Sequence, residues 1–191
     1  MIKTSRLILR DFILTDWEAV FSFLSDQEVT QYMHFSSYSQ ADFKKWFSWC
    51  LANDQKEHRV AHNWAIVLQQ AEQVIGWLGI GEPSGPAIEG ERDFGFALDK
   101  LHWGNGYMTE ALQAVLAYEF EQLGAKRIYG MCEIKNEASA RVMEKAGMHY
   151  EGTFYDADFE GNVARRFRYG IHYEEFLSQT NPGEYLRRDN R

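Results

Sequence analysis

Apolar and polar positions follow two different periods along this chain, which predict strands and helices in turn. Leu7 and Leu9 lie two residues apart in a short apolar segment between the charged residues Arg6 and Arg10, as expected of a strand with one buried face. Elsewhere, apolar residues recur three and four positions apart, which is typical of helices. The pattern predicts strands at residues 6–12, 63–68, 74–80, 93–98, 127–133, 149–154 and 166–173. It predicts helices that start near Thr15, Ser39, Thr109 and Asn136.

The order of these elements predicts one α+β domain. We expect a mixed, twisted central sheet of six or seven strands, flanked by about four helices. The polar residues 69–73 between the second and third strands suit a hairpin connection. A length of 191 residues is enough for one well-buried core and short for two. Since no repeat or linker interrupts the pattern, the domain is expected to span residues 1–177, followed by a polar tail at 178–191.

Composition and charge narrow the classes of protein to which the chain can belong. A hydrophobic fraction of 45% with 25% charged residues is typical of globular domains and argues against disorder. No apolar run reaches the length of a membrane-spanning helix, and the amino end reads as a strand rather than a signal peptide. Two distant cysteines, Cys50 and Cys132, favour a reducing compartment, so we expect a cytoplasmic protein. A net charge of −8 argues against nucleic-acid binding and suits a cationic substrate such as an amine.

The most informative segment is WGNGYMTEA at residues 103–111, between a predicted strand and a predicted helix. Its two glycines permit a tight turn, after which successive amides converge at a helix N-terminus that favours an anion. A strand-to-helix turn that needs glycine only for its geometry would show the same pattern. On the phosphate-binding interpretation, the backbone donors are Gly104, Asn105, Gly106, Tyr107 and Met108, and the Thr109 hydroxyl adds a side-chain donor.

Four segments in order give this chain a resemblance to a known family. They are TSRLILRDF at residues 4–12, FGFALDKLH at 94–102, WGNGYMTEA at 103–111 and NEASARVMEKAGMHYEG at 136–152. Together they resemble the GNAT acetyltransferase superfamily. The first segment and the W-G-x-G-Y loop resemble the branch that includes the ribosomal-protein N-terminal acetyltransferases. The resemblance runs from Thr4 to about Tyr173 and implies transfer of an acetyl group from acetyl-CoA to an amine.

The resemblance also implies where the coenzyme binds. The loop at residues 104–109 would hold its pyrophosphate, and the pantetheine arm would lie along the backbone of Phe96, Ala97 and Leu98 like an extra strand. Asn136 would position that arm or cap the helix that follows it. Two positions depart from the pattern of the family, because Trp103 replaces a common Arg or Gln and Met108 replaces a small residue. Acetyl-CoA is the expected cosubstrate, and no metal is expected.

Acetyl transfer to an amine needs a base, a donor for the carbonyl oxygen and an acid for the leaving thiolate. The chain has no G-x-S-x-G motif, so we expect direct attack in a ternary complex. The resemblance implies that Ser139 is the acid, and it makes Asp158 a candidate base. A first-turn serine and a solvated loop carboxylate with no catalytic role would look the same. Other candidate carboxylates are Glu110, Glu119 and Asp156, and a backbone amide near Leu98 is the expected carbonyl donor.

The sequence leaves the acceptor open. A protein N-terminal amine is expected from the branch that the chain resembles, and a small-molecule amine, such as an antibiotic or a polyamine, is the alternative. A sensor that binds acyl-CoA without turnover would keep the loop but need neither Ser139 nor Asp158. His58 and His62 have the spacing of a zinc pair, but Arg59 replaces the glutamate of H-E-x-x-H. No nucleic-acid or membrane partner is expected, and a homodimer is compatible with the sequence.

Overall fold

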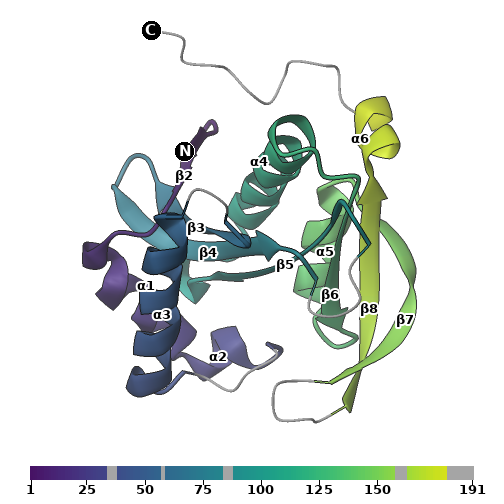
Figure 1. Ribbon diagram of the computed structural model, residues 1–191. Helices are drawn as coiled ribbons and strands as arrows, with labels where there is room; N and C mark the ends of the chain where they lie inside the picture. The colour runs from purple at the N-terminus through teal and green to yellow at the C-terminus, as the bar shows by residue number, and fades with distance from the viewer. Residues whose placement is uncertain (34–37, 57–58, 84–87, 158–162, 180–191) are drawn as a thin grey trace, which may run out of the picture.

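A single eight-stranded mixed sheet runs through the molecule, in the order β1-β2-β3-β4-β5-β6-β8-β7 (Figure 1). The computed structural model describes residues 1–33, 38–56, 59–83, 88–157 and 163–179, and all elements below lie in these ranges. The strands are β1 (Ile2–Lys3), β2 (Leu7–Arg10), β3 (Ala61–Leu68), β4 (Gln73–Gly81), β5 (Glu91–Leu98), β6 (Arg127–Glu133), β7 (His149–Ala157) and β8 (Val163–His172). The helices are α1 (Trp17–Leu24), α2 (Gln27–Thr30), α3 (Gln40–Asp54), α4 (Tyr107–Gln122), α5 (Glu137–Lys145) and α6 (Tyr173–Gln179).

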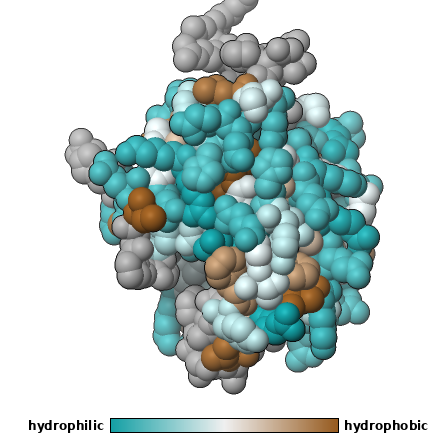
Figure 2. All heavy atoms as spheres, turned by 90° about the vertical axis from the view of Figure 1, so that its right-hand side faces the viewer, coloured by the Kyte–Doolittle hydropathy of each residue, from teal (hydrophilic) through white to brown (hydrophobic). Residues whose placement is uncertain are grey.

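Helices cover both faces of the sheet and bury two apolar cores. The stripe of α4 that begins at Met108 packs with α5 on one face, where it contacts Trp64, Ile66 and Leu98 of the sheet. On the other face, α1 and α3 pack against Ala65, Val67 and Ala97. The central strands are therefore buried on both faces, which explains why β3 and β4 read as nearly continuous apolar runs. The face that carries β7 and β8 is mostly hydrophilic, with separate hydrophobic side chains (Figure 2).

The described residues contain more elements than the sequence predicted. Eight strands and six α-helices replace the expected six or seven strands and about four helices. β1 has two residues and α2 has four, and neither is long enough to show a period. The last strand was predicted to include Tyr173, but the chain enters α6 there. The predicted end of the domain at residue 177 thus lies inside a helix.

The central strands β5 and β6 lie parallel for half their length and then separate. They pair from Glu91 opposite Arg127 to Phe94 opposite Gly130. Beyond that point β5 pairs only with β4 on its other side, and β6 pairs only with β8. An opening therefore lies between the carboxyl-terminal halves of β5 and β6, where ligands bind in many open sheets of this kind. Among the helices of the described ranges, none is long and apolar enough to cross a membrane.

Candidate active site

The loop after β5 has the conformation that its glycines predict. Gly104 and Gly106 both have a φ of +77°, a region that favours glycine, and Gly106 is the N-cap of α4. A Cβ atom at Gly104 would meet nothing within 4 Å, and one at Gly106 would lie 3.6 Å from Nη2 of Arg6. The glycines are therefore required by backbone conformation and not by crowding, and the space in front of them is open.

Helix α4 starts at Tyr107, two residues before the predicted Thr109. The amides of Tyr107, Met108 and Thr109 thus belong to the first turn of a helix, where no carbonyl of that helix accepts from them. With the positive end of the helix dipole, they form a place for an anion. The start of α4 therefore provides several of the donors that the sequence predicted for a phosphate group.

Side chains hold the loop in this shape. Nδ2 of Asn105 donates to the carbonyls of His102 (3.2 Å) and Trp103 (3.0 Å). Arg6, directly before β2, donates through Nη1 to the Asn105 carbonyl at 2.9 Å. Its guanidinium lies 4.6 Å from the centroid of the Tyr107 ring. The carbonyls of His102, Trp103 and Asn105 are thus paired with side chains of the protein, and the helix-start amides remain available to a ligand.

The edge of β5 at the opening has backbone groups that no described strand pairs with. The Asp99 amide donates to the Ile75 carbonyl of β4 at 2.8 Å. Because successive residues of a strand point to opposite sides, Phe96 and Leu98 direct their backbone groups toward the opening. The indole Nε1 of Trp103 donates to the Leu98 carbonyl at 2.7 Å, which ties the loop to the end of β5. The remaining groups of Phe96 and the Leu98 amide can pair with an extended ligand.

The start of α5 borders the same opening, because α5 follows the free end of β6. Oδ1 of Asn136 accepts from the Ser139 amide at 3.1 Å, so Asn136 is the N-cap of α5. The Ser139 side chain lies near the thiol of Cys132, on the separated half of β6, and acts to lower the pKa of that thiol. Burial raises the pKa of the Cys132 thiol to about 11, so this thiol stays neutral and is a poor nucleophile.

The sequence-predicted carboxylates fall in different places. Asp158 lies outside the described residues. Glu110 accepts from Thr4, Ser5 and Arg6 and so fixes the amino-terminal segment to α4. Glu119 lies near the other end of α4, far along the helix from the loop.

Sequence reasoning missed Asp93, which the structure places where the strands part. Asp93 is opposite Tyr129, one residue before the last β5–β6 pair, and its charge contributes to the raised pKa of Tyr129 after burial. By alternation it shares a face with Ala97, on the side of α1 and α3. The available signal was a carboxylate directly before the apolar half of the strand, which reads ERDFGFAL.

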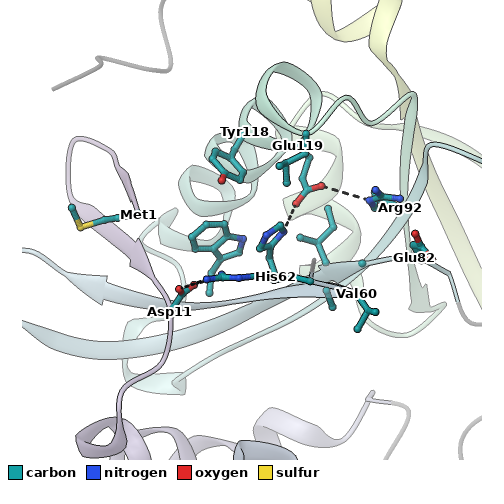
Figure 3. A pocket seen from close by; sticks show the side chains of 14 residues that line it. Met1, Asp11, Val60, His62, Glu82, Arg92, Tyr118 and Glu119 are labelled. Atoms are coloured by element: carbon teal, nitrogen blue, oxygen red, sulfur yellow. Dashed lines mark hydrogen bonds and ion pairs between the residues drawn. The ribbon is translucent and has the colours of Figure 1, made fainter. Parts of the chain in front are cut away.

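A second cluster lies at the opposite end of α4, around a cavity of about 440 Å³. Figure 3 shows Glu119 of α4 pointing toward His62 and Arg92 of the sheet. Oε1 of Glu119 lies 3.3 Å from Nδ1 of His62, Oε2 lies 3.8 Å from Nε of Arg92, and Glu119 is 1% exposed. These pairs brace the end of α4 against the sheet. His58 lies outside the described residues. Among the residues that the structure describes, no group of three His, Cys, Asp or Glu side chains is arranged to hold a metal.

Comparisons with known proteins agree on one family. The model of the acetyltransferase (GNAT) domain matches residues 6–149. The uncharacterized N-acetyltransferase YnaD of Bacillus subtilis (strain 168) is 31% identical over 161 residues, which cover 84% of this chain and 89% of the relative. A GNAT-family acetyltransferase structure from Bacillus anthracis superposes with a TM-score of 0.77 at 28% identity, covering 91% of this chain and 98% of that one. Spermidine N-acetyltransferase from Vibrio cholerae, in complex with CoA and spermine, shares the fold with a TM-score of 0.76 at 19% identity, over 91% and 99% of the two chains.

Proposed function

Because this chain belongs to the GNAT family of acetyltransferases, we propose that it transfers the acetyl group of acetyl-CoA to a primary amine, with a protein N-terminal amine as the acceptor. The observation that carries this proposal is the opening between β5 and β6, with the residue 104–109 loop at its mouth. The opening offers an unpaired strand edge, and the loop offers helix-start amides. An extended amide-bearing arm that ends in a pyrophosphate needs both of these.

In this proposal the coenzyme binds in two parts. Its pyrophosphate accepts from the amides of residues 104–109 and from the Thr109 hydroxyl. Its pantetheine amides pair with the backbone groups of Phe96, so that the arm takes the place of the β6 partner that β5 lacks there. Asn136 acts from the other side of the opening, by capping α5 and so fixing the position of Ser139.

The chemistry then needs no covalent enzyme intermediate. The neutral amine attacks the thioester carbon, a C–N bond forms and the C–S bond breaks. The Leu98 amide donates to the carbonyl oxygen as it gains negative charge. The leaving sulfur takes the proton of the Ser139 hydroxyl, and the proton released by the attacking nitrogen restores that hydroxyl through solvent. The products are the N-acetylated amine and CoA with a free thiol.

A base must first remove a proton from the acceptor's ammonium group. We propose two carboxylates for this role, Asp158 from the sequence and Asp93 from the structure. Asp93 lies on the α1 and α3 face where the strands part, so an acceptor approaching from that face would meet it. An ordinary carboxylate is a weak base for an ammonium group, so transfer through a water molecule is the route we expect.

The acceptor class follows from the resemblance to the N-terminal acetyltransferase branch. The fold that this chain shares with spermidine N-acetyltransferase makes a polyamine the second candidate. The position of Ser139 beside the opening favours catalysis over a sensor that only binds acyl-CoA.

Incubation with acetyl-CoA and defined amines tests the proposal directly. The panel contains short peptides with a free N-terminus, the same peptides with a blocked N-terminus, and spermidine, and the products are read by mass spectrometry. Acetylation of the free peptides alone is the expected result. Acetylation of spermidine alone would move the function to the polyamine class. Binding of acetyl-CoA without transfer to any amine would contradict the enzyme and support a sensor.

A further inference from the structure

The cavity of about 440 Å³ at the far end of α4 is separate from the place proposed for the coenzyme. Its walls come from the start of β3, the end of β4 and the last turns of α4, at Tyr118 and Glu119. The residue 104–109 loop lies at the opposite end of α4. A ligand in this cavity would therefore be additional to acetyl-CoA and its acceptor, and its recognition does not depend on the proposed function.

Arg92 of β5 is fixed at this cavity with part of its guanidinium group unused. Its Nη1 donates to the Glu91 carbonyl at 3.0 Å, and its Nε lies 3.8 Å from Oε2 of Glu119. Glu119 is 1% exposed and is shared with His62, so the carboxylate orients both side chains. Nη2 of Arg92 hydrogen-bonds no residue of the described ranges. This nitrogen can still pair with a carboxylate that enters the cavity.

A carboxylate with an opposite preference lies next to Arg92. The last pair of β4 and β5 at this end joins Gly81 to Asp93, and Glu82 and Arg92 come next on the two chains, at neighbouring positions. Figure 3 shows both side chains on the same side of the cavity. The exposed Glu82 carboxylate makes no ion pair with any residue that the structure describes. A cation alone would meet Arg92 and an anion alone would meet Glu82, whereas a zwitterion can pair with both.

The other ion pair that borders the cavity is already satisfied. Nη1 and Nη2 of Arg59 donate to the two carboxylate oxygens of Asp11, each at 2.8 Å. Because each group occupies the other in this bidentate pair, the pair presents little net charge to a ligand. The charged groups of a ligand are therefore expected at Arg92 and Glu82.

Apolar and aromatic side chains surround these charges. Met1, Val60 and Leu123 line the cavity and are all more than a third exposed. The rings of Trp64 and Tyr118 meet edge to face at 5.4 Å on another wall. Nε1 of Trp64 is buried and has no hydrogen-bond partner among the described residues, a cost that an acceptor atom from a ligand would remove. The lining thus favours a ligand with an apolar part beside its two charges.

We propose that this cavity binds a free α-amino acid with an apolar side chain, in its zwitterionic form. The carboxylate of the amino acid pairs with Arg92 and its ammonium group with Glu82. Both charged groups of an α-amino acid are attached to one carbon atom, which matches the neighbouring positions of the two residues. The side chain of the amino acid packs against Tyr118 and Trp64. The cavity volume lies within the range of about 300–1,000 Å³ that is common for small-molecule sites.

Calorimetric titration of the full chain with L-phenylalanine and two blocked analogues tests this site. L-Phenylalaninamide lacks the carboxylate, and N-acetyl-L-phenylalanine lacks the ammonium group. We expect L-phenylalanine to bind with a Kd of about 1 mM or lower, and each analogue to bind about tenfold more weakly. Glu82→Gln should lower the affinity for L-phenylalanine about tenfold. Glu174→Gln is the matched control, because Glu174 is an exposed carboxylate on α6 and should leave the affinity unchanged.

The outcomes distinguish this site from the site of acetyl transfer. An acceptor site requires the amino group but not the carboxylate, so equal or tighter binding of L-phenylalaninamide would overturn the proposal. Absence of saturable L-phenylalanine binding, or an affinity that Glu82→Gln leaves unchanged, would overturn it as well. Saturating CoA should leave the affinity for L-phenylalanine unchanged, and competition between the two would contradict a separate site. Failure of CoA to bind would contradict the proposed coenzyme and leave the amino-acid titration valid.

Discussion

Ser139 owes its position to two neighbours rather than to its place in the sequence alone. The Asn136 side chain fixes the first turn of α5 through the Ser139 amide, and the Cys132 thiol of β6 lies near the Ser139 side chain, which acts to lower the pKa of that thiol. Ser139 thus lies between the helix start and the free half of β6. A residue in this position can give a proton to a thiolate that leaves within the opening.

Replacing the hydroxyl tests its role as an acid. We expect Ser139→Ala to lower kcat by roughly ten- to a thousandfold and to leave the affinity for acetyl-CoA nearly unchanged. Ser139→Thr is the control, because it keeps a hydroxyl on the same backbone. Steady-state rates and calorimetric affinities of the two variants give the comparison. Turnover of Ser139→Ala at the wild-type rate would reduce Ser139 to a structural residue.

Asp54 at the end of α3 should make stability depend on pH. Burial, followed by the charge of Asp11, raises its pKa to about 6, although Arg59 and His62 act in the opposite direction. The folded state therefore holds this proton more tightly than the unfolded chain, whose aspartates titrate near 4. The stabilising contribution is full below about pH 4 and is lost as the pH rises through about 6.

Asp54→Asn removes that titration. We expect the variant to match the wild type near about pH 4.5 and to be more stable by roughly 1–3 kcal/mol near about pH 7.5. Urea unfolding at both pH values measures the difference. A difference that does not grow with pH would show that Asp54 is as well solvated in the folded state as in the unfolded one.

At the scale of elements, the strand–loop–helix unit of β5, the loop and α4 concentrates the features of the site. Its conformation follows from local sequence, because two glycines with positive φ and an amphipathic helix need no distant contact to be recognised. The same holds for α5, where the predicted Asn136 cap is confirmed, and for β6, whose predicted bounds of 127–133 are those observed.

Elements that depend on tertiary contacts were not predictable. β1 has two residues and exists because it pairs with β2, and no alternation is detectable over that length. The start of α4 was predicted two residues late, since Tyr107 and Met108 look like loop residues until the cap at Gly106 is known. Asp93 was missed for a similar reason, because only the register of β5 and β6 places it where the strands part.

A negative charge in the residue 104–109 loop should weaken coenzyme binding. Gly106→Asp places a carboxylate in front of the helix-start amides, and we expect coenzyme affinity to fall by about tenfold or more. Gly106→Asn is the matched control, since asparagine has the same shape and also tolerates positive φ. Calorimetry on both variants isolates the effect of charge. Equal affinities for the coenzyme would mean that the loop does not hold a phosphate.

At the scale of the whole molecule, a buried core on each face of the sheet stabilises a sheet in which β5 and β6 separate. Residues of β5 pack into the core on the α4 side and into the core on the α1–α3 side. The free half of β6 pairs with one strand, β8. The Glu119, His62 and Arg92 cluster secures the far end of α4, so its start stays in place over the opening. The family and the fold class followed from four short motifs in order, because those motifs carry the geometry of this opening.

The acceptor did not follow from the sequence, for a physical reason. In the proposed function, backbone amides bind the coenzyme, and glycines and helix caps indicate the position of such amides in a sequence. An acceptor is recognised by side chains from several separate segments, such as Asp93 in a strand and Asp158 in a loop. The identity of these side chains does not indicate an acceptor until the fold places their segments together.

Calorimetric titration of the wild-type chain with acetyl-CoA, with NADH and ATP as controls, tests the central claim most directly. We expect saturable binding of acetyl-CoA at micromolar concentration and no comparable binding of the two controls, which share its pyrophosphate-type charge but lack the pantetheine arm. Absence of acetyl-CoA binding would contradict the assignment of both the loop and the β5–β6 opening.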